Sequence, residues 1–268
     1  MRHLILFITI ILLATGCIKD DGNPGFPVTD GDRLVSYSFF YDSEEWDAVD
    51  FIYNDNNQII KAWIKLRPGS NRIAYYFEYD ENGRLTEVFS GHRKETYHYD
   101  ESGTLKKILF YVSRDFGNTF IQGDQPGFKF HYDDRGKIKR KEMLFKNDPV
   151  GNYTYGYSIK NYFYQWENGN IVESRAYNRD SVRALTYLYQ YDNKPNYRFK
   201  QPAMWYFNAK SLSKNNVVEE AIIDHLGYYH PRFNCNPCTK RYSYNNSGMP
   251  VFQRIGGSTE RYVKLKYE

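Results

Sequence analysis

The sequence lacks a long apolar run after its first segment, and its mean hydropathy is −0.73. A membrane-spanning helix is therefore not expected beyond that segment, and the body of the chain is predicted to be soluble. A strong excess of one charge is also missing. The formal net charge is +4, with acids and bases interspersed and no basic stripe, so nucleic-acid binding is not indicated.

Recognisable catalytic motifs are absent as well. The chain contains no Gly-rich phosphate loop, no GxSxG and no HExxH. This absence favours a non-enzymatic protein. An enzyme acting on a polysaccharide or peptide stays open, because carboxylates from distant strands can meet in space without leaving a local motif.

The first segment has the three-part layout of a secretory signal. Arg2 and His3 give a basic start, an apolar run follows over 4–13, and small residues then precede Cys17. The apolar run is too short to span a membrane. An ordinary secretory signal with a chance cysteine is the alternative reading.

The placement of Cys17 directly after Gly16 resembles a bacterial lipobox, although Ala14 stands where that pattern usually has leucine. The resemblance implies that 1–16 is removed and that Cys17 carries lipid, including palmitate, which anchors the chain in the outer membrane. Residues 17–33 then read as a tether rich in Gly, Pro and Asp. Within it, Lys19-Asp20-Asp21 resembles the surface-export signal of Bacteroidetes lipoproteins, which favours the cell surface over the periplasm.

Aromatic residues are abundant, with 27 Tyr and 18 Phe, and many of them belong to a repeat. The clearest unit is "YYFEYDENGRLTEV" (Tyr75 to Val88), in which side chains of alternating character indicate a strand. The frame is Tyr-Asp, then glycine, then an apolar residue. It recurs at Tyr79-Asp80 with Gly83, at Tyr99-Asp100 with Gly103 and at Tyr132-Asp133 with Gly136. More divergent copies follow Tyr53, Gln165-Trp166, Tyr191 and Tyr244.

Each position of the frame has a mechanical reason. Asp80, Asp100 and Asp133 are predicted to accept hydrogen bonds from backbone amides of a tight turn. Gly83, Gly103 and Gly136 are predicted to adopt a left-handed conformation, which Asn57 tolerates in its own copy. These residues are therefore interpreted as turn stabilisers rather than catalytic carboxylates or calcium ligands.

Hairpins in series predict an all-β fold, an antiparallel meander that forms a large curved or barrel-like sheet over 34–268 as one domain. At most one short helix is expected. The stretch from Asn215 to Gly227 fits one or two helical turns, but Val217-Val218 and Ile222-Ile223 suit strands equally well.

The Tyr-Asp and Gly-Leu frame resembles the YD repeats of RHS-type proteins. The chain is more similar to a family of Bacteroidetes lipoproteins that combine a lipobox, degenerate YD-like hairpins, a "YDNKPN" stretch (Tyr191 to Asn196) and "SKNNVV" (Ser213 to Val218). That resemblance implies a mostly antiparallel, porin-like β fold and carries no catalytic residue or cofactor.

One segment has metal-ligand residue types. Cys235 and Cys238 are spaced as CxxC, and His225 and His230 lie upstream. With Cys17 lipidated these are the only remaining thiols, and in an exported protein a structural disulfide between them is favoured. A zinc site built from His225, His230, Cys235 and Cys238 and a free or redox-active pair remain as alternatives.

The composition favours a tethered binding or structural module. Exposed aromatics on a sheet face suit stacking against sugar rings, so a glycan is the first candidate ligand. Trp205 and Tyr206, in "PAMWYF", are the candidate stacking residues, with a buried anchor as the alternative. An envelope assembly or transport role, with a lipid or envelope protein as partner, is the third hypothesis.

Overall fold

The computed structural model describes residues 33–41, 44–65, 68–113, 115, 117, 119–144, 159–196, 209–227, 236–256 and 261–268. These residues form sixteen strands and one short helix. The elements are β1 (Leu34–Tyr41), β2 (Glu44–Tyr53), β3 (Ile59–Lys65), β4 (Ile73–Tyr79), β5 (Leu85–Phe89), β6 (Arg93–Tyr99), β7 (Leu105–Ser113), β8 (Phe120–Tyr132), β9 (Ile138–Leu144), β10 (Ile159–Glu167), β11 (Asn170–Asn178), β12 (Arg183–Pro195), α1 (Ala209–Leu212), β13 (Asn215–Asp224), β14 (Cys238–Tyr244), β15 (Pro250–Ile255) and β16 (Arg261–Tyr267).

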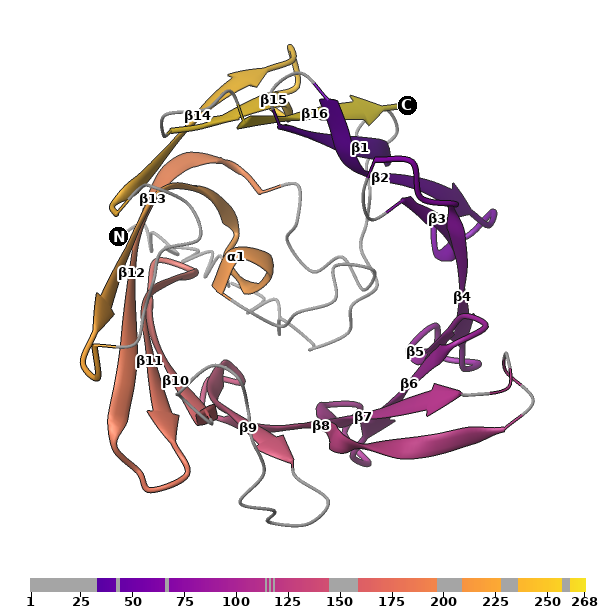
Figure 1. The fold of residues 1–268 in the computed structure, drawn as a ribbon, viewed down its shortest axis with the longest axis horizontal. Coiled ribbons are helices and arrows are strands. Elements are labelled where there is room, and N and C mark those ends of the chain that lie inside the picture. The colour runs from indigo at the N-terminus through magenta and orange to yellow at the C-terminus, as the bar shows by residue number, and fades with distance from the viewer. Residues whose placement is uncertain are drawn as a thin grey trace, which may run out of the picture.

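The strands form a closed antiparallel barrel (Figure 1). Each strand pairs with the next along the chain, and β1 pairs with β16 from Tyr41 opposite Arg261 to Leu34 opposite Tyr267. The expected all-β hairpin meander is confirmed, and of the two expected shapes the closed one is found. Closure removes the unpaired edges that a wide sheet would otherwise expose.

The helical alternative for the stretch after Asn215 is wrong. Residues Asn215 to Asp224 form β13, which pairs with β12 from Leu185 opposite Asp224 to Tyr191 opposite Val217. Backbone pairing along both strands outweighs the local helix preference of Glu219-Glu220-Ala221. The one helix among the described residues, α1, lies just before this strand and inside the ring of strands (Figure 1).

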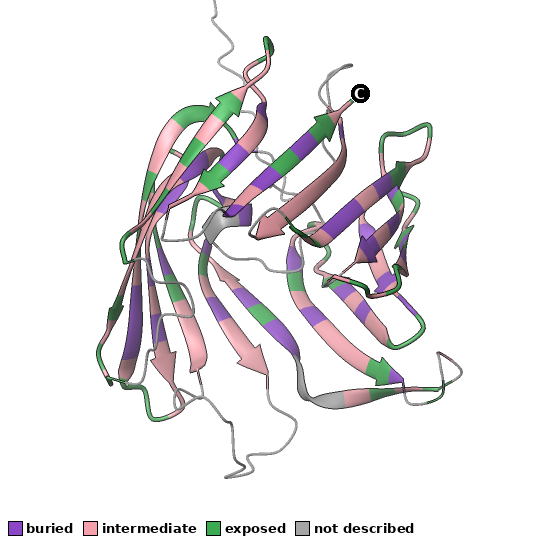
Figure 2. Ribbon diagram, turned by 45° about the horizontal axis from the view of Figure 1, so that its top comes forward, coloured by how far each residue is buried: buried purple, intermediate pink, exposed green. Residues whose placement is uncertain are grey.

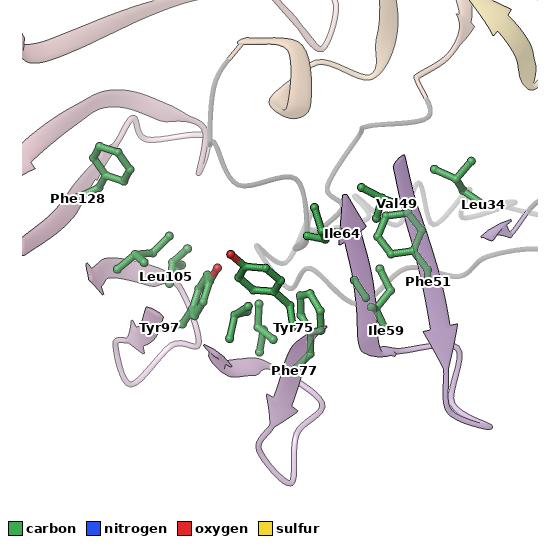
Figure 3. Packing of buried hydrophobic residues seen from close by; sticks show 14 of the residues in the cluster. Leu34, Val49, Phe51, Ile59, Ile64, Tyr75, Phe77, Tyr97, Leu105 and Phe128 are labelled. Carbon is green, nitrogen blue, oxygen red and sulfur yellow. The ribbon is translucent and has the colours of Figure 1, made fainter. Parts of the chain in front are cut away.

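The two faces of the wall differ in chemistry. Buried and exposed residues alternate along most strands (Figure 2), and the buried ones point into the barrel (Figure 3). The buried core is apolar and aromatic: Leu34, Val49, Phe51, Ile59, Ala62, Ile64, Tyr75, Phe77, Leu85, Val88, Tyr97, Leu105, Ile108, Phe128, Phe130, Ile138, Tyr164, Ile171, Val263 and Leu265. The outward face carries ion pairs such as Asp50 with Arg72 and Glu87 with Lys94.

One end of the barrel, the turn rim, is built from repeated turns at 54–58, 80–84, 100–104, 133–137, 168–169 and 245–249. The two ends of the described chain complete this rim, because Arg33 and Glu268 exchange backbone hydrogen bonds of 3.3 and 3.0 Å. The repeat in the sequence is therefore the repeat of one rim of the barrel.

Aromatic side chains join neighbouring hairpins at the turn rim. In the seam between β3 and β4 the ladder ends at Lys61 opposite Tyr76, and the Tyr79 hydroxyl donates 2.9 Å to the carbonyl of Ile59 just beyond it. Eight such bonds, the rim latches, circle the barrel. The donors and acceptors are Tyr53 to Leu34, Tyr79 to Ile59, Tyr99 to Leu85, Tyr132 to Leu105, Trp166 to Ile138, Tyr191 to Ile171, Tyr242 to Val217 and Tyr267 to Pro250.

Candidate functional site on the outer wall

Several residues singled out in the sequence lie outside the described residues: Cys17, Trp205, Tyr206, His230 and Cys235. Their roles stay predictions. In the described part of the chain, no helix has the length and hydropathy of a membrane span.

The described part of the His and Cys segment has structural partners. His225 Nε2 lies 2.9 Å from Thr186 Oγ1, and the His225 amide donates to the carbonyl of Ala184. Cys238 is disulfide-bonded. Its pairing with Cys235 stays a prediction, because the bonded partner lies outside the described residues. Among the residues described, no group of three His, Cys, Asp or Glu side chains is arranged to hold a metal ion.

The repeat acids lie in the turns. Asp80 Oδ1 accepts from the amides of Asn82 and Arg84, at 3.0 and 2.8 Å, and Asp133 Oδ1 accepts in the same way from Arg135 and Lys137. Asp100 Oδ1 accepts from the Ser102 hydroxyl and the Thr104 amide. The hydrogen bonds from Ser102 and Lys106 hold the pKa of the Asp100 carboxyl below its usual range.

The positions predicted to need a left-handed backbone have it. Gly83, Gly103 and Gly136 have φ of 74°, 81° and 75°, and Asn57 has 58°. In one divergent copy of the repeat, the tyrosine position lies one residue later than the sequence frame predicts. Trp166, not Gln165, takes the tyrosine position and lies opposite Ile171, because the turn there contains only Asn168 and Gly169.

Two inward carboxylates lie next to cations. Glu95 on β6 lies 3.2 Å from Arg93 and accepts from the Tyr97 hydroxyl at 3.0 Å. Burial raises the pKa of Glu95, and Arg93 acts against that rise. Glu220, on β13, lies 3.5 Å from Lys240.

A row of aromatic and cationic side chains crosses five adjacent strands on the outward face. In register, Lys61 on β3 lies opposite Tyr76 on β4, Tyr76 opposite Phe89 on β5, Phe89 opposite Lys94 on β6, and Lys94 opposite Tyr111 on β7. We call these five residues the outer row. Four strand spacings of about 4.8 Å give the row a length of about 19 Å.

Side-chain contacts join three members of the outer row. The rings of Tyr76 and Phe89 are stacked, with centroids 5.4 Å apart at 25°. Lys61 Nζ lies 5.1 Å from the Tyr76 ring and 4.2 Å from the ring of Trp63 on the same strand. Lys94 forms an ion pair of 2.8 Å with Glu87. At the β3 end of the row an ammonium group therefore lies against two aromatic rings.

The outer row keeps part of its surface accessible. Tyr76 is 41% exposed, the largest value in the row. Lys61 forms no ion pair with any carboxylate in the described ranges. Such a row can contact an elongated ligand through ring faces and direct a cation at an anionic group on that ligand.

Comparisons with known proteins give structural similarities only. No family model matches the chain, and no curated protein matches it. A porin-like protein from Bacteroides uniformis ATCC 8492 is 11% identical, with a TM-score of 0.49 over 89% of this chain and 98% of that chain. A porin-like protein from Bacteroides vulgatus ATCC 8482 is 11% identical over 88% and 99%, with a TM-score of 0.34. A TcdB2-TccC3-Cdc42 crystal structure is 12% identical over 82% and 13%, also at 0.34. At these values the similarities assign no function to this chain.

Proposed function

We propose that the protein is an envelope lipoprotein whose barrel is a non-enzymatic binding module, with a glycan as ligand on the outer row. The observation that carries the proposal is the register of the row, which brings Tyr76, Phe89 and Tyr111 into one line with two lysines. Tyrosine supplies a rigid contact surface with an apolar ring and a polar tip, which suits a sugar ring with its apolar faces and hydroxyl edge.

The charges of the row support an acidic glycan over a neutral one. Lys61 has no described carboxylate as a partner, so it is available to an anionic sugar. Lys94 is already paired with Glu87, so its contribution is smaller. Electrostatic complementarity of this kind gives selectivity among ligands of similar shape.

The chemistry of the two faces of the wall supports a barrel surrounded by water rather than by lipid. A transmembrane barrel presents an apolar band to lipid and a polar interior. Here the buried core is mostly apolar, and the outward face carries ion pairs and lysines, as at Arg72 with Asp50. Attachment to the outer membrane is therefore proposed through lipid on Cys17, with 17–33 as the tether and the barrel held at the surface.

The binding proposal is tested by the melting temperature of the non-lipidated protein against a panel of acidic and neutral oligosaccharides. A ligand present at a hundred times its dissociation constant adds about 2.7 kcal/mol of stability, which is a measurable shift. We expect one acidic oligosaccharide to raise the melting temperature, and Tyr76→Ala to weaken its binding at least tenfold in calorimetry.

The matched control is Phe163→Ala, which removes another outward aromatic, on β10 away from the row. It is expected to leave the affinity unchanged. A panel without any shift would contradict glycan binding, and equal losses in both variants would contradict the outer row as the site.

Lipid attachment has a separate test. Metabolic labelling with palmitate is expected to mark the wild-type protein and not Cys17→Ala, and the variant is expected to leave the membrane fraction. Equal labelling of the two proteins would contradict lipidation at Cys17, without affecting the binding proposal.

A further inference from the structure

Lys141 is a lysine on the inward face of the barrel. It lies on β9 between Ile138 on the turn-rim side and Met143 on the far side, opposite Phe130 of β8 and Tyr162 of β10. Lys141 is buried, with 5% of its surface exposed. The ammonium lies between two rings, with Nζ 4.6 Å from the centroid of Phe128 and 4.7 Å from that of Tyr162.

The equivalent position is apolar or small in four other hairpins. Each hairpin has a bulge after the turn, so the second inward residue comes three positions after the first. Along β3, β5, β7 and β11 that second residue is Ala62, Val88, Ile108 or Ser174, all buried. Along β13 and β15 it is Glu220, which has Lys240 as its ion-pair partner, and Gln253. Lys141 is therefore a charged residue at this level without the ion pair that Glu220 has.

No described residue supplies a counter-charge. Two other inward cations have one: Arg93 has Glu95 at 3.2 Å and Lys240 has Glu220 at 3.5 Å. Lys141 has neither an ion pair nor a hydrogen bond within the described ranges, and its partners are the two rings. Burial alone lowers the pKa of Lys141 to about 8. Burying an unpaired charge is costly, and ring faces offset only part of that cost.

The surface beyond Lys141 is apolar and only partly covered. Phe110 and Met143 face inward on the side away from the turn rim, and each keeps some exposure, whereas Leu105 and Ile138 on the rim side are buried. Phe110 packs edge-on against Phe128 at 5.2 Å, so the apolar surface continues to the rings that hold the ammonium. This is the composition of a small-molecule site, with an apolar lining and one polar group that fixes orientation.

We propose that Lys141 is the anion-binding group of an interior site for an apolar molecule with a single carboxylate, of the long-chain fatty acid type. The carboxylate would supply the counter-charge that the described residues do not, and the chain would lie against Phe110 and Met143. The single positive charge of the ammonium balances a singly charged carboxylate. A phosphate would bring a second negative charge that no described residue there balances. This site is independent of the outer row and uses the other face of the wall.

The experiment compares laurate with dodecanol, which has the same chain and no charge, by calorimetry on the non-lipidated protein. Wild type is expected to bind laurate at least tenfold more tightly than dodecanol. Lys141→Met is expected to lose that preference and to keep its dodecanol affinity. Lys129→Met removes an equal charge from the outward face of β8 and is expected to behave as wild type.

A second readout needs no variant. After reductive methylation with ¹³C-formaldehyde, the dimethylamine of Lys141 can be titrated by NMR. Saturating laurate is expected to raise the pKa of this amine by at least one unit, because an ion pair favours its charged form, and dodecanol is expected to leave it unchanged. Equal laurate affinity in wild type and Lys141→Met, no laurate binding to wild type, or a pKa unmoved by laurate would each overturn the proposal.

Discussion

At the residue scale, the turn rim depends on a few backbone conformations. Gly136 has φ of 75°, and a methyl group added there would meet no heavy atom within 4 Å. Any cost of a side chain at this position is therefore a backbone cost rather than a clash. At the equivalent position of its own turn, Asn57 has φ of 58°, because asparagine tolerates the left-handed region better than most residues.

Gly136→Ala is expected to lower the free energy of unfolding by about 1–2 kcal/mol, the cost of a left-handed conformation for an L-residue. Urea denaturation followed by circular dichroism measures it. Arg135→Ala, in the same turn and exposed, is the control and is expected to change stability little. A loss of the same size in both variants would mean that the turn is sensitive to any change, and not to φ.

Lys141 gives a pH-dependent prediction. Its pKa is about 8 in the folded protein against an ordinary value of 10.5, so between these values the unfolded chain binds more protons than the native one. Stability therefore rises with pH across this window, and below about pH 8 the full penalty is present, on the order of 3 kcal/mol. The titratable group packed against the amine is Tyr162, whose pKa burial raises; Phe128 and Phe130 on β8 do not titrate.

Lys141→Met is accordingly expected to be more stable than wild type at pH 7, and the difference should shrink as pH approaches 10. Chemical denaturation of both proteins at a series of pH values measures this, and groups common to the two cancel. A difference that stays constant with pH would contradict a buried, destabilised ammonium.

At the element scale, the hairpins are held together by the rim latches. Burial raises the pKa of Tyr79, so its hydroxyl keeps its proton and can donate. The Tyr79 hydroxyl donates to the Ile59 carbonyl, which lies just past the end of the β3 and β4 ladder, where no backbone amide is opposite. This explains why the strand-end residue of the repeat is an aromatic with a donor, and why Trp166 substitutes for tyrosine in one hairpin.

Tyr79→Phe is expected to cost about 1 kcal/mol, because one hydrogen bond is lost and the Ile59 carbonyl keeps no partner from this side chain. Tyr76→Phe, on the outward face of the same strand, removes a hydroxyl without a described partner and is the matched control, expected near zero. Thermal denaturation of both variants makes the comparison. Equal melting temperatures for the two would contradict the latch.

The hairpins can be predicted from the sequence, but the contacts between hairpins cannot. The turn chemistry of Tyr79-Asp80 and Gly83 predicts the hairpin, and the hairpin brings Tyr76 opposite Phe89. The contact of Lys61 with Tyr76 joins two different hairpins, so its register depends on the whole sheet and the outer row was not foreseen. The sequence also did not show that Lys141 faces inward. Strict alternation from Ile138 would point Lys141 outward into water, and the bulge after the turn reverses the alternation.

At the scale of the whole molecule, closure gives the wall two separate faces. An open sheet of sixteen strands would leave β1 and β16 as edges and expose the apolar face on which Lys141 lies. In the barrel, β1 and β16 pair instead, and the rim latch from Tyr53 to Leu34 continues the ring past the join. The proposed interior site for an apolar acid and the proposed glycan-binding outer row lie on these two different faces.

The most direct test of closure is residue-resolved amide hydrogen exchange in β1. A central strand has both alternate sets of amides bonded, whereas an edge strand has only the set that faces its one neighbour. The closed barrel predicts slow exchange for amides throughout Ser36 to Tyr41, on the side of β2 and on the side of β16 alike. Fast exchange confined to the set that faces β16 would show an open sheet and contradict this account.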